Sequence, residues 1–334
     1  MTARRHHVRH LHTGWPTPYT DDPLRPSEIC YRAPVRTGPL ERGQLPEATA
    51  VLAAACAFDR AAEVADEKLF GPGPRSSPRP FGAWDGTALV GVASVAGNRI
   101  RVLAVDPTAR GRGAGSALLA ACQAAARDAG EATLRTLDQP GNYLAPGIDE
   151  RNALAIGWLE RRGWRRLGEP RTNVLIDVRR NPRVSAERAA ELAATAGRAG
   201  YEIRRARAGE QTLLDAVAAE FGGAWPFELG RALTCDPPGV HVALQGGACC
   251  AFAAHDGNNR GLGWFGPTGT WPAHRGRGLG EALLLACLVD VAATHAQCEV
   301  AWIGPRPFYE RVAGIAGERR FVVLTRELPA EAAS

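Results

Sequence analysis

The 334-residue sequence lacks the features that mark several protein classes. No apolar run approaches the roughly 20 residues that a membrane-spanning helix needs. The eight cysteines form no C-x-x-C pair and show no zinc spacing, and the neighbours Cys249 and Cys250 lie in an apolar run, as small core residues do. The net charge is only +5, and the body of the chain has no dense basic block. These absences argue against a membrane protein, a metal site and a nucleic-acid partner.

The N-terminus is the one markedly basic segment, because arginines and histidines fill most of residues 4–12. It leads into no apolar core, so it does not resemble a signal peptide, and we expect a cytoplasmic protein. A segment rich in His and Arg can bind nucleic acid or metal, but no aromatic series or groove-reading motif accompanies this one. We therefore interpret residues 1–32 as a flexible, solvated arm.

Two short segments rich in glycine and arginine are the most informative feature of the chain. Residues 110–115 read Arg-Gly-Arg-Gly-Ala-Gly, and residues 275–280 read Arg-Gly-Arg-Gly-Leu-Gly. Each follows an apolar, strand-like run, has a proline shortly before it (Pro107 and Pro272), and precedes an apolar helical run. A glycine-rich turn into a helix presents backbone N–H groups to an anion such as a pyrophosphate, and glycine lets the backbone approach it closely.

Other ligands of glycine-rich turns fit these segments less well. The dinucleotide-binding loop needs a G-x-G-x-x-G spacing that neither segment has, and the P-loop needs a Gly-Lys-Ser/Thr ending that is absent. A tight helix-entry turn without a ligand is the remaining alternative, and it explains one copy better than two.

The order of apolar runs and turns repeats around the two segments, which predicts two domains. Each half reads as a helical region, a hairpin (at Asp85-Gly86 and at residues 245–247), a strand, the glycine-rich segment and a helix. Residues 181–200 read as a helical connector with Ser185 as its N-cap. We therefore expect domains at residues 33–180 and 201–328.

Both glycine-rich segments resemble the R-x-x-G-x-G/A loop of the GNAT acetyltransferase superfamily, which cradles the pyrophosphate of acetyl-CoA. Residues 140–149 and 266–270, together with Phe58-Asp59 and residues 67–71, look like segments of tandem-GNAT glucosamine/glucosaminide N-acetyltransferases. The resemblance covers nearly all of residues 35–327. It implies an α/β (α+β) fold of two tandem GNAT domains, each with a mixed, mostly antiparallel sheet flanked by helices.

The resemblance also implies acetyl-CoA as the acetyl donor, without a metal. Its phosphates would lie on Arg275, Gly276, Arg277, Gly278, Leu279 and Gly280, and its pantetheine would lie alongside Thr268, Gly269 and Thr270. A second molecule has an implied site at Leu103, Val105, Arg110, Gly111, Arg112, Gly113, Ala114 and Gly115.

Acetyl transfer to an amine uses backbone donors that polarise the thioester carbonyl, a base for the ammonium and an acid for the departing thiolate. Residues 308–311 resemble the F-Y-E-K/R segment that holds the tyrosine acid of GNAT enzymes, which makes Tyr309 the implied acid. The aligned residues 158–161 carry Leu159 in that place, and leucine cannot donate a proton. We therefore expect a catalytic second domain and a degenerate first one. A tyrosine that only packs is the alternative.

Glu299 lies in the apolar run 298–303, where a carboxylate is unusual. The resemblance maps the family's base, typically an aspartate, to this position, and burial would raise its pKa. A solvated carboxylate at the start of a strand is the alternative. Trp225, Phe227 and Trp264 are weaker candidates for acceptor contacts, because aromatic walls suit sugar rings but more often form core.

We therefore expect an acetyl-CoA-dependent N-acetyltransferase that acts on a primary amine of a small molecule by direct attack in a ternary complex. An amino sugar, or a natural product that contains one, fits the resemblance. A mycothiol-synthase-like enzyme, itself a tandem GNAT, and an antibiotic self-resistance acetyltransferase are alternatives within the class. A non-catalytic acyl-CoA-binding protein is the alternative of another class. The oligomeric state and the identity of the acceptor stay open.

Overall fold

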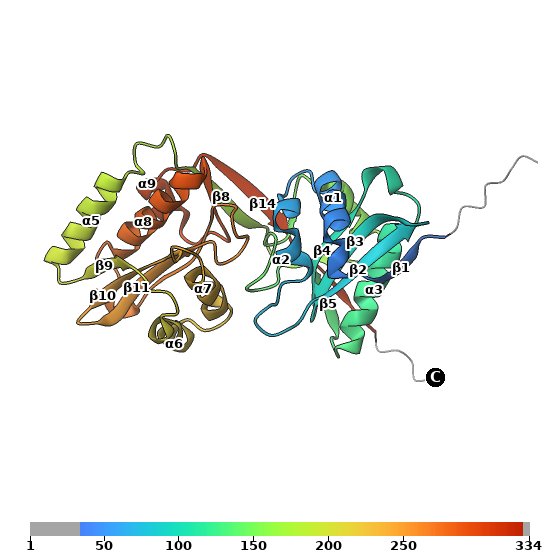
Figure 1. Ribbon diagram of the computed structural model, residues 1–334, viewed down its shortest axis with the longest axis horizontal. Helices are drawn as coiled ribbons and strands as arrows, with labels where there is room; N and C mark the ends of the chain where they lie inside the picture. Colours follow the sequence, from blue (N-terminus) through green and yellow to red (C-terminus); the bar gives the residue numbers. More distant parts are fainter. Residues whose placement is uncertain (1–33, 330–334) are drawn as a thin grey trace, which may run out of the picture. The chain divides into compact units, whose positions relative to one another are not determined.

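The computed structural model describes residues 34–329, which form two β-sheets with helices packed against them (Figure 1). The arm predicted at residues 1–32 lies outside the described residues. Both sheets are mixed, with one parallel pair each among antiparallel neighbours, so the predicted fold class is confirmed. Among residues 34–329, no helix is both long enough and apolar enough to cross a membrane.

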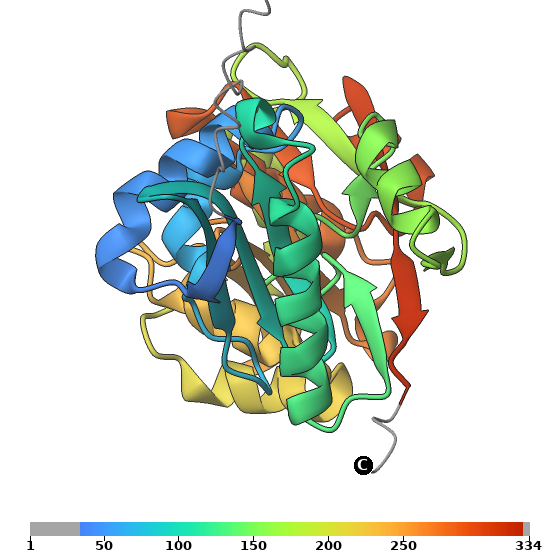
Figure 2. The same cartoon turned by 90° about the vertical axis from the view of Figure 1, so that its right-hand side faces the viewer.

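The first sheet has the strand order β1-β2-β3-β4-β5-β15-β7. Its helix α3 packs on one face through Leu118 and Cys122, and α1 and α2 pack on the other through Leu52 and Leu69 (Figure 2). Strand β3 serves both faces because alternate side chains point to opposite sides of a sheet. The strands are β1 (Arg36–Pro39), β2 (Arg79–Asp85), β3 (Ala88–Ala96), β4 (Arg99–Val105), β5 (Thr133–Thr136), β7 (Arg165–Arg166) and β15 (Leu324–Glu327), and the helices are α1 (Leu45–Ala55), α2 (Ala65–Leu69), α3 (Ala114–Asp128) and α4 (Ala153–Glu160).

The second sheet has the order β6-β14-β8-β13-β12-β11-β10-β9. Helices α5, α8 and α9 cover one face of this sheet, and α6 and α7 pack on the other face over β10 and β11. The strands are β6 (Ile148–Asp149), β8 (Arg171–Asp177), β9 (Glu202–Arg205), β10 (Val240–Gln245), β11 (Ala248–His255), β12 (Trp264–Thr270), β13 (Gln297–Val300) and β14 (Gly317–Val322), and the helices are α5 (Ala186–Arg198), α6 (Gln211–Glu220), α7 (Trp225–Leu233), α8 (Leu279–Thr294) and α9 (Arg306–Val312).

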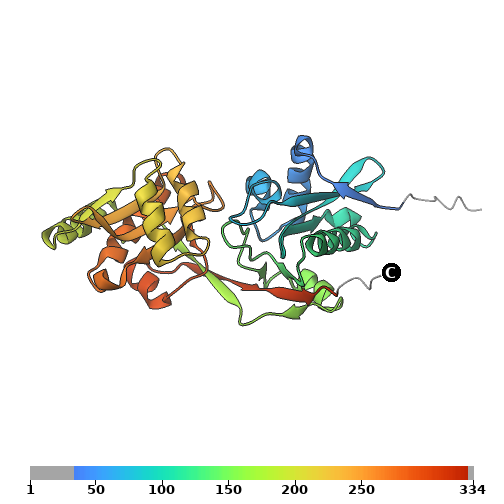
Figure 3. The same cartoon turned by 90° about the horizontal axis from the view of Figure 1, so that it is seen from below.

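The two halves of the chain exchange strands. β8 belongs to the first half in sequence but lies between β13 and β14 of the second sheet, and β15 belongs to the second half but lies between β5 and β7 of the first. Figure 3 shows the red strands β14 and β15 running from the second sheet to the first. The described residues therefore form one compact unit, and the domain division at residues 181–200 stays a prediction. The connector is helical as expected, with Ser185 Oγ accepting a hydrogen bond from the backbone N–H of Arg188 at 3.2 Å.

A buried lysine links the halves directly. Lys68 of α2 is fully buried, and its ammonium donates hydrogen bonds to Glu67 at 2.7 Å, Asn142 at 2.9 Å and Asn258 at 2.8 Å. Asn258 belongs to the loop between β11 and β12, so this contact joins the first half to the second. Burial lowers the pKa of Lys68 to about 7, although the Glu67 carboxylate opposes that shift.

A histidine–carboxylate network joins helix α8 to strands β9, β10 and β11 of the second sheet. Asp290 of α8 accepts hydrogen bonds from His241 at 2.7 Å, from His255 at 3.3 Å and from Arg205 at 2.6 Å. His255 also bonds Asp256 at 2.8 Å. Burial alone would lower the pKa of His255, but its two carboxylate partners raise it to about 9.

Candidate active site

The two glycine-rich loops adopt the same backbone conformation. Gly276 and Gly278 have φ angles of +75° and +76°, and Gly111 and Gly113 have +79° and +92°. These are left-handed values that only glycine adopts without strain, and a Cβ atom at any of the four would meet no heavy atom within 4 Å. The loops are therefore open at the surface, and α8 and α3 begin immediately after them. Free N–H groups at a helix N-terminus suit a pyrophosphate.

The first arginine of each loop holds the loop in shape. Arg275 donates from Nε to the backbone carbonyl of Thr270 at 3.2 Å, and Arg110 makes the same bond to Val105 at 3.2 Å. Each arginine thus ties the loop to the last residue of the strand before it. The geometry of the implied coenzyme sites fits acetyl-CoA in both halves, and the binding itself stays a prediction.

A gap between two parallel strands leads away from each loop. In the second half, β12 pairs with β13 only at Trp264–Glu299 and Phe265–Val300. Residues 268–270 continue in β12 and pair only with β11, so their other edge has backbone groups free for a ligand. The first half repeats this arrangement, since β4 and β5 also pair at only two positions. An extended pantetheine chain fits such an edge.

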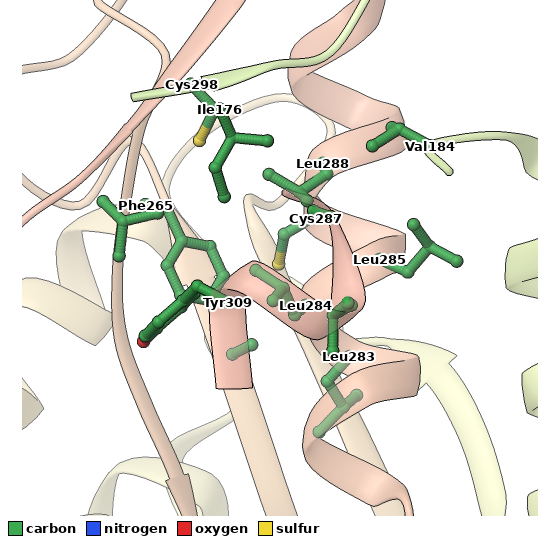
Figure 4. Packing of buried hydrophobic residues seen from close by; sticks show 14 of the residues in the cluster. Ile176, Val184, Phe265, Leu283, Leu284, Leu285, Cys287, Leu288, Cys298 and Tyr309 are labelled. Atoms are coloured by element: carbon green, nitrogen blue, oxygen red, sulfur yellow. The ribbon is translucent and has the colours of Figure 1, made fainter. Parts of the chain in front are cut away.

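Tyr309 lies where β12 and β13 part. Its ring packs against Phe265 of β12, at a centroid distance of 6.5 Å, and against Phe308 at 5.0 Å. The residue is 5% exposed, and burial raises the pKa of its hydroxyl to about 12. Its hydroxyl makes no hydrogen bond to any described residue and points away from the leucines of α8 (Figure 4). The matching helix of the first half, α4, buries Leu159.

Glu299 lies on the opposite face of the second sheet from Tyr309. Its neighbours Cys298 and Val300 are buried in the same core cluster as Tyr309, so strand alternation turns Glu299 the other way. Its carboxylate accepts hydrogen bonds from Arg319 at 3.1 Å to each oxygen, and from Asn173 at 2.6 Å. The sequence suggested a lone carboxylate in an apolar strand, whereas the structure gives it a cationic and an amide partner.

Arg319 joins Glu299 to the first half of the chain. It donates to Asp59 at 2.6 Å, to Asp149 at 3.1 Å and to the backbone carbonyl of Phe58 at 2.8 Å. Burial raises the pKa of Asp59, although Arg319 counteracts that shift. Sequence reasoning did not single out Asp59 or Asp149 as site residues. The only signal was their place in segments that carried the resemblance.

The three aromatic candidates for acceptor contacts are all packed. Trp225 stacks on Phe221 at 5.2 Å within an aromatic group that also holds Phe252 and Trp271. Trp264 is 3% exposed and meets the edge of Tyr143 at 6.0 Å. Phe227 lies against Gly141 of the first half, since a Cβ atom at that glycine would be 3.1 Å from its ring. Their role in acceptor binding stays a prediction.

Residues 78–166 match the family model described as an acetyltransferase (GNAT) domain. The chain therefore carries a GNAT acetyltransferase domain. The match covers the first half, which has Leu159 in place of the tyrosine, and it supports an N-acetyltransferase. No curated protein sequence matches the chain. No group of three or more His, Cys, Asp or Glu side chains among residues 34–329 is arranged to hold a metal ion.

Solved structures show that the GNAT fold extends over both halves. A glucosamine N-acetyltransferase region of a fungal multi-domain GH3 β-N-acetylglucosaminidase aligns with a TM-score of 0.68 and 16% identity, over 88% of this chain and 38% of that longer one. A tandem GNAT protein from the clavulanic acid biosynthesis pathway gives 0.63 and 20%, over 89% of this chain and 100% of the other. A GCN5-related N-acetyltransferase from Sphaerobacter thermophilus gives 0.62 and 17%, over 89% and 96%. This protein thus has a tandem GNAT architecture.

Proposed function

We propose that this protein transfers an acetyl group from acetyl-CoA to a primary amine of a small molecule, and that the second half performs the reaction. The observation that carries the assignment is the position of Tyr309 at the point where β12 and β13 part, beside the open strand edge and the glycine-rich loop. The first half has an equivalent loop and strand edge but Leu159 in place of the acid.

In the reaction we propose, a base takes a proton from the amine and an acid assists the departing sulfur, and the candidates for the two roles lie on opposite faces of the sheet. The amine nitrogen forms a bond to the thioester carbon while its proton passes to a base, and the carbon–sulfur bond then breaks to release the thiolate. Backbone N–H groups of residues 268–270 polarise the carbonyl oxygen. Tyr309 approaches the sulfur from the α8 face, and Glu299 approaches the amine from the other face.

The ion pair with Arg319 shapes the role of Glu299. Hydrogen bonds from a guanidinium and an amide fix the orientation of the Glu299 carboxylate, which we propose attracts and orients the ammonium of the acceptor. Asp59 is linked to the same guanidinium and is a second candidate for the proton acceptor, because burial raises its pKa toward the range useful for a base.

The acceptor that fits best is an amino sugar or a natural product that contains one. The sequence resemblance supports it, and so does the fungal structural neighbour, which is described as a glucosamine N-acetyltransferase region. Mycothiol-synthase-like activity and antibiotic self-resistance remain alternatives within the same chemistry. We propose that the coenzyme site of the first half is not catalytic, because this half has a loop that can hold acetyl-CoA but no acid.

A panel of amines with acetyl-CoA, followed by release of free thiol, tests the proposal. We expect turnover with glucosamine and amino-sugar antibiotics, and little with polyamines or peptides. Calorimetry with acetyl-CoA, on the wild type and on a variant of each glycine-rich loop, counts the coenzyme sites. A protein that binds acetyl-CoA but releases no thiol with any amine would be a binding protein, and the enzymatic proposal would be wrong.

A further inference from the structure

We propose that Trp302 and Phe58 form the walls of the acceptor site and select amines carried on a ring. The inference rests on the proposed function and adds the acceptor class that the second half accepts. Neither residue belongs to a glycine-rich loop, and neither is the proposed acid or base.

Both residues are aromatic side chains left open at the surface. Among residues 34–329, the exposed large hydrophobic side chains are Phe58 at 38%, Leu154 at 82%, Leu167 at 38% and Trp302 at 42%. The two aromatic ones are both attached to the network of Arg319 and Glu299 through their backbones. Exposed aromatic rings beside catalytic groups indicate a contact surface for a ligand.

The ring of Trp302 is held in a fixed orientation. The guanidinium of Arg171 lies 4.1 Å from its centroid, and Arg171 is itself bound to Asp138 at 2.9 Å and to the carbonyl of Pro146 at 3.1 Å. Tyr143 meets the ring edge at a centroid distance of 6.0 Å and an angle of 89°. The guanidinium thus covers one face of the indole, while 42% of the residue stays exposed.

The backbone of Trp302 is tied to the catalytic carboxylate. Asn173 accepts a hydrogen bond from the Trp302 N–H at 2.8 Å and donates one to Glu299 at 2.6 Å. A single amide thus joins the backbone of Trp302 to the carboxylate of Glu299. Trp302 has a φ angle of +49°, which a side chain of this size rarely adopts.

The first half has no aromatic residue at the matching turn. The strand pairing matches Ile100–Thr136 to Phe265–Val300, so Leu137 corresponds to Ala301 and the buried Asp138 corresponds to Trp302. The exposed ring at this turn is therefore a feature of the second half. The difference parallels that between Tyr309 and Leu159, since the half with the acid is also the half with the open indole.

Phe58 lies at the other end of the same network. Its carbonyl accepts a hydrogen bond from Arg319 at 2.8 Å, and the Arg151 guanidinium lies 4.7 Å from its ring centroid. The carboxylates of Asp59 and Glu299 share Arg319, which also donates to the backbone of Phe58. An acceptor with an ammonium and a ring fits, because the carboxylates attract the charge and the rings stack on the C–H faces of a sugar or cyclitol. An acyclic amine of equal charge would be attracted by the carboxylates but would not stack on the rings.

The test compares Trp302→Ala with two amine acceptors, glucosamine and its open-chain reduced relative glucosaminitol (2-amino-2-deoxyglucitol). We expect the KM for glucosamine to rise roughly 10-fold while the KM for acetyl-CoA stays unchanged. The KM for glucosaminitol should change little, and Trp302→Phe should recover most of the loss. Phe58→Ala should act in the same direction. Leu154→Ala, which removes an even more exposed apolar side chain from α4, is the control and should change neither KM.

Calorimetry of glucosamine binding to the complex with CoA separates this inference from the proposed function. If the wild type acetylates glucosamine and Trp302→Ala binds it equally well, the stacking role is wrong while the acetyltransferase stands. Equal losses for glucosamine and glucosaminitol would indicate general damage to the site and would also overturn the inference. A wild type that acetylates acyclic amines but no cyclic one would refute the inference alone, and a wild type that acetylates no amine would refute both.

Discussion

Replacement of Tyr309 by phenylalanine tests the assignment of the acid with the least structural disturbance. The ring would keep its packing on Phe265 and Phe308, and the lost hydroxyl leaves no partner unpaired, because it makes no hydrogen bond to any described residue. Removal of such a group changes the free energy of unfolding by less than about 1 kcal/mol. The variant should therefore fold and bind acetyl-CoA as the wild type does.

The size of the expected loss follows from the pKa of the hydroxyl. Tyr309 has a pKa of about 12, and a thiol in water has a pKa of about 8.5, so complete proton transfer to a solvated thiolate would be uphill by roughly 5 kcal/mol. A hydrogen bond from Tyr309 to the developing thiolate avoids this uphill proton transfer. Hydrogen bonds to charged groups contribute about 1.5–3 kcal/mol. The turnover of Tyr309→Phe should accordingly fall by roughly 10- to 150-fold.

The assay is single-turnover release of CoA thiol with saturating acceptor, so that product release does not mask the chemical step. Leu159→Met, which alters the matching position of the first half, is the control and should leave the rate unchanged. Because a hydroxyl with a pKa of about 12 stays protonated, the wild-type rate should show no alkaline loss attributable to Tyr309 below about pH 11. Full activity of Tyr309→Phe in a chemically limited turnover would show that the thiolate departs unaided.

Two further predictions concern the loops and the histidine network. Arg275→Ala combined with Gly278→Val should abolish turnover, because it removes a loop anchor and forces a left-handed position onto a branched residue, whereas the equivalent changes within residues 110–115 should leave turnover intact. A folded first-half variant without turnover would show that this half takes part in catalysis. The pKa of His255 is raised above its unfolded value of 6.5 to about 9, so its stabilisation is complete below about pH 6.5 and is lost as the pH rises through 9. The difference in unfolding free energy between wild type and His255→Gln should shrink by at most about 3 kcal/mol from pH 6 to pH 10, and a difference independent of pH would refute the linkage.

The local parts of this fold were predictable from the sequence because their signals are local. The hairpins, the glycine-rich turns with their following helices and the Ser185 cap each depend on a few neighbouring residues. Helix α7 was not among the elements predicted from the sequence, and Pro226 near its start would be unfavourable in a helix interior. Proline is nevertheless well tolerated in the first turn of a helix, which is where it lies.

The surroundings of Glu299 could not be predicted, because its partners are remote in sequence. Arg319 lies 20 residues further along the chain, Asn173 lies 126 residues before Glu299, and Asp59 lies 260 residues before Arg319. The open rings of Phe58 and Trp302 were missed for a similar reason. Exposure depends on tertiary packing, and the same residue types more often form core.

Because the two halves exchange β8 and β15, neither sheet is complete without a strand from the other half. A duplicated domain without the proposed acid would ordinarily be free to decay or to be deleted, yet deletion of the first half here would remove β8 from beside β13, the strand that carries Glu299. If the second half is catalytic as proposed, selection for catalysis acts on both halves. The exchange also orders events during synthesis, because the first sheet lacks β15 until the strands of the second sheet have been translated. The first half must therefore wait, with an unpaired edge between β5 and β7, for a strand made after the second sheet.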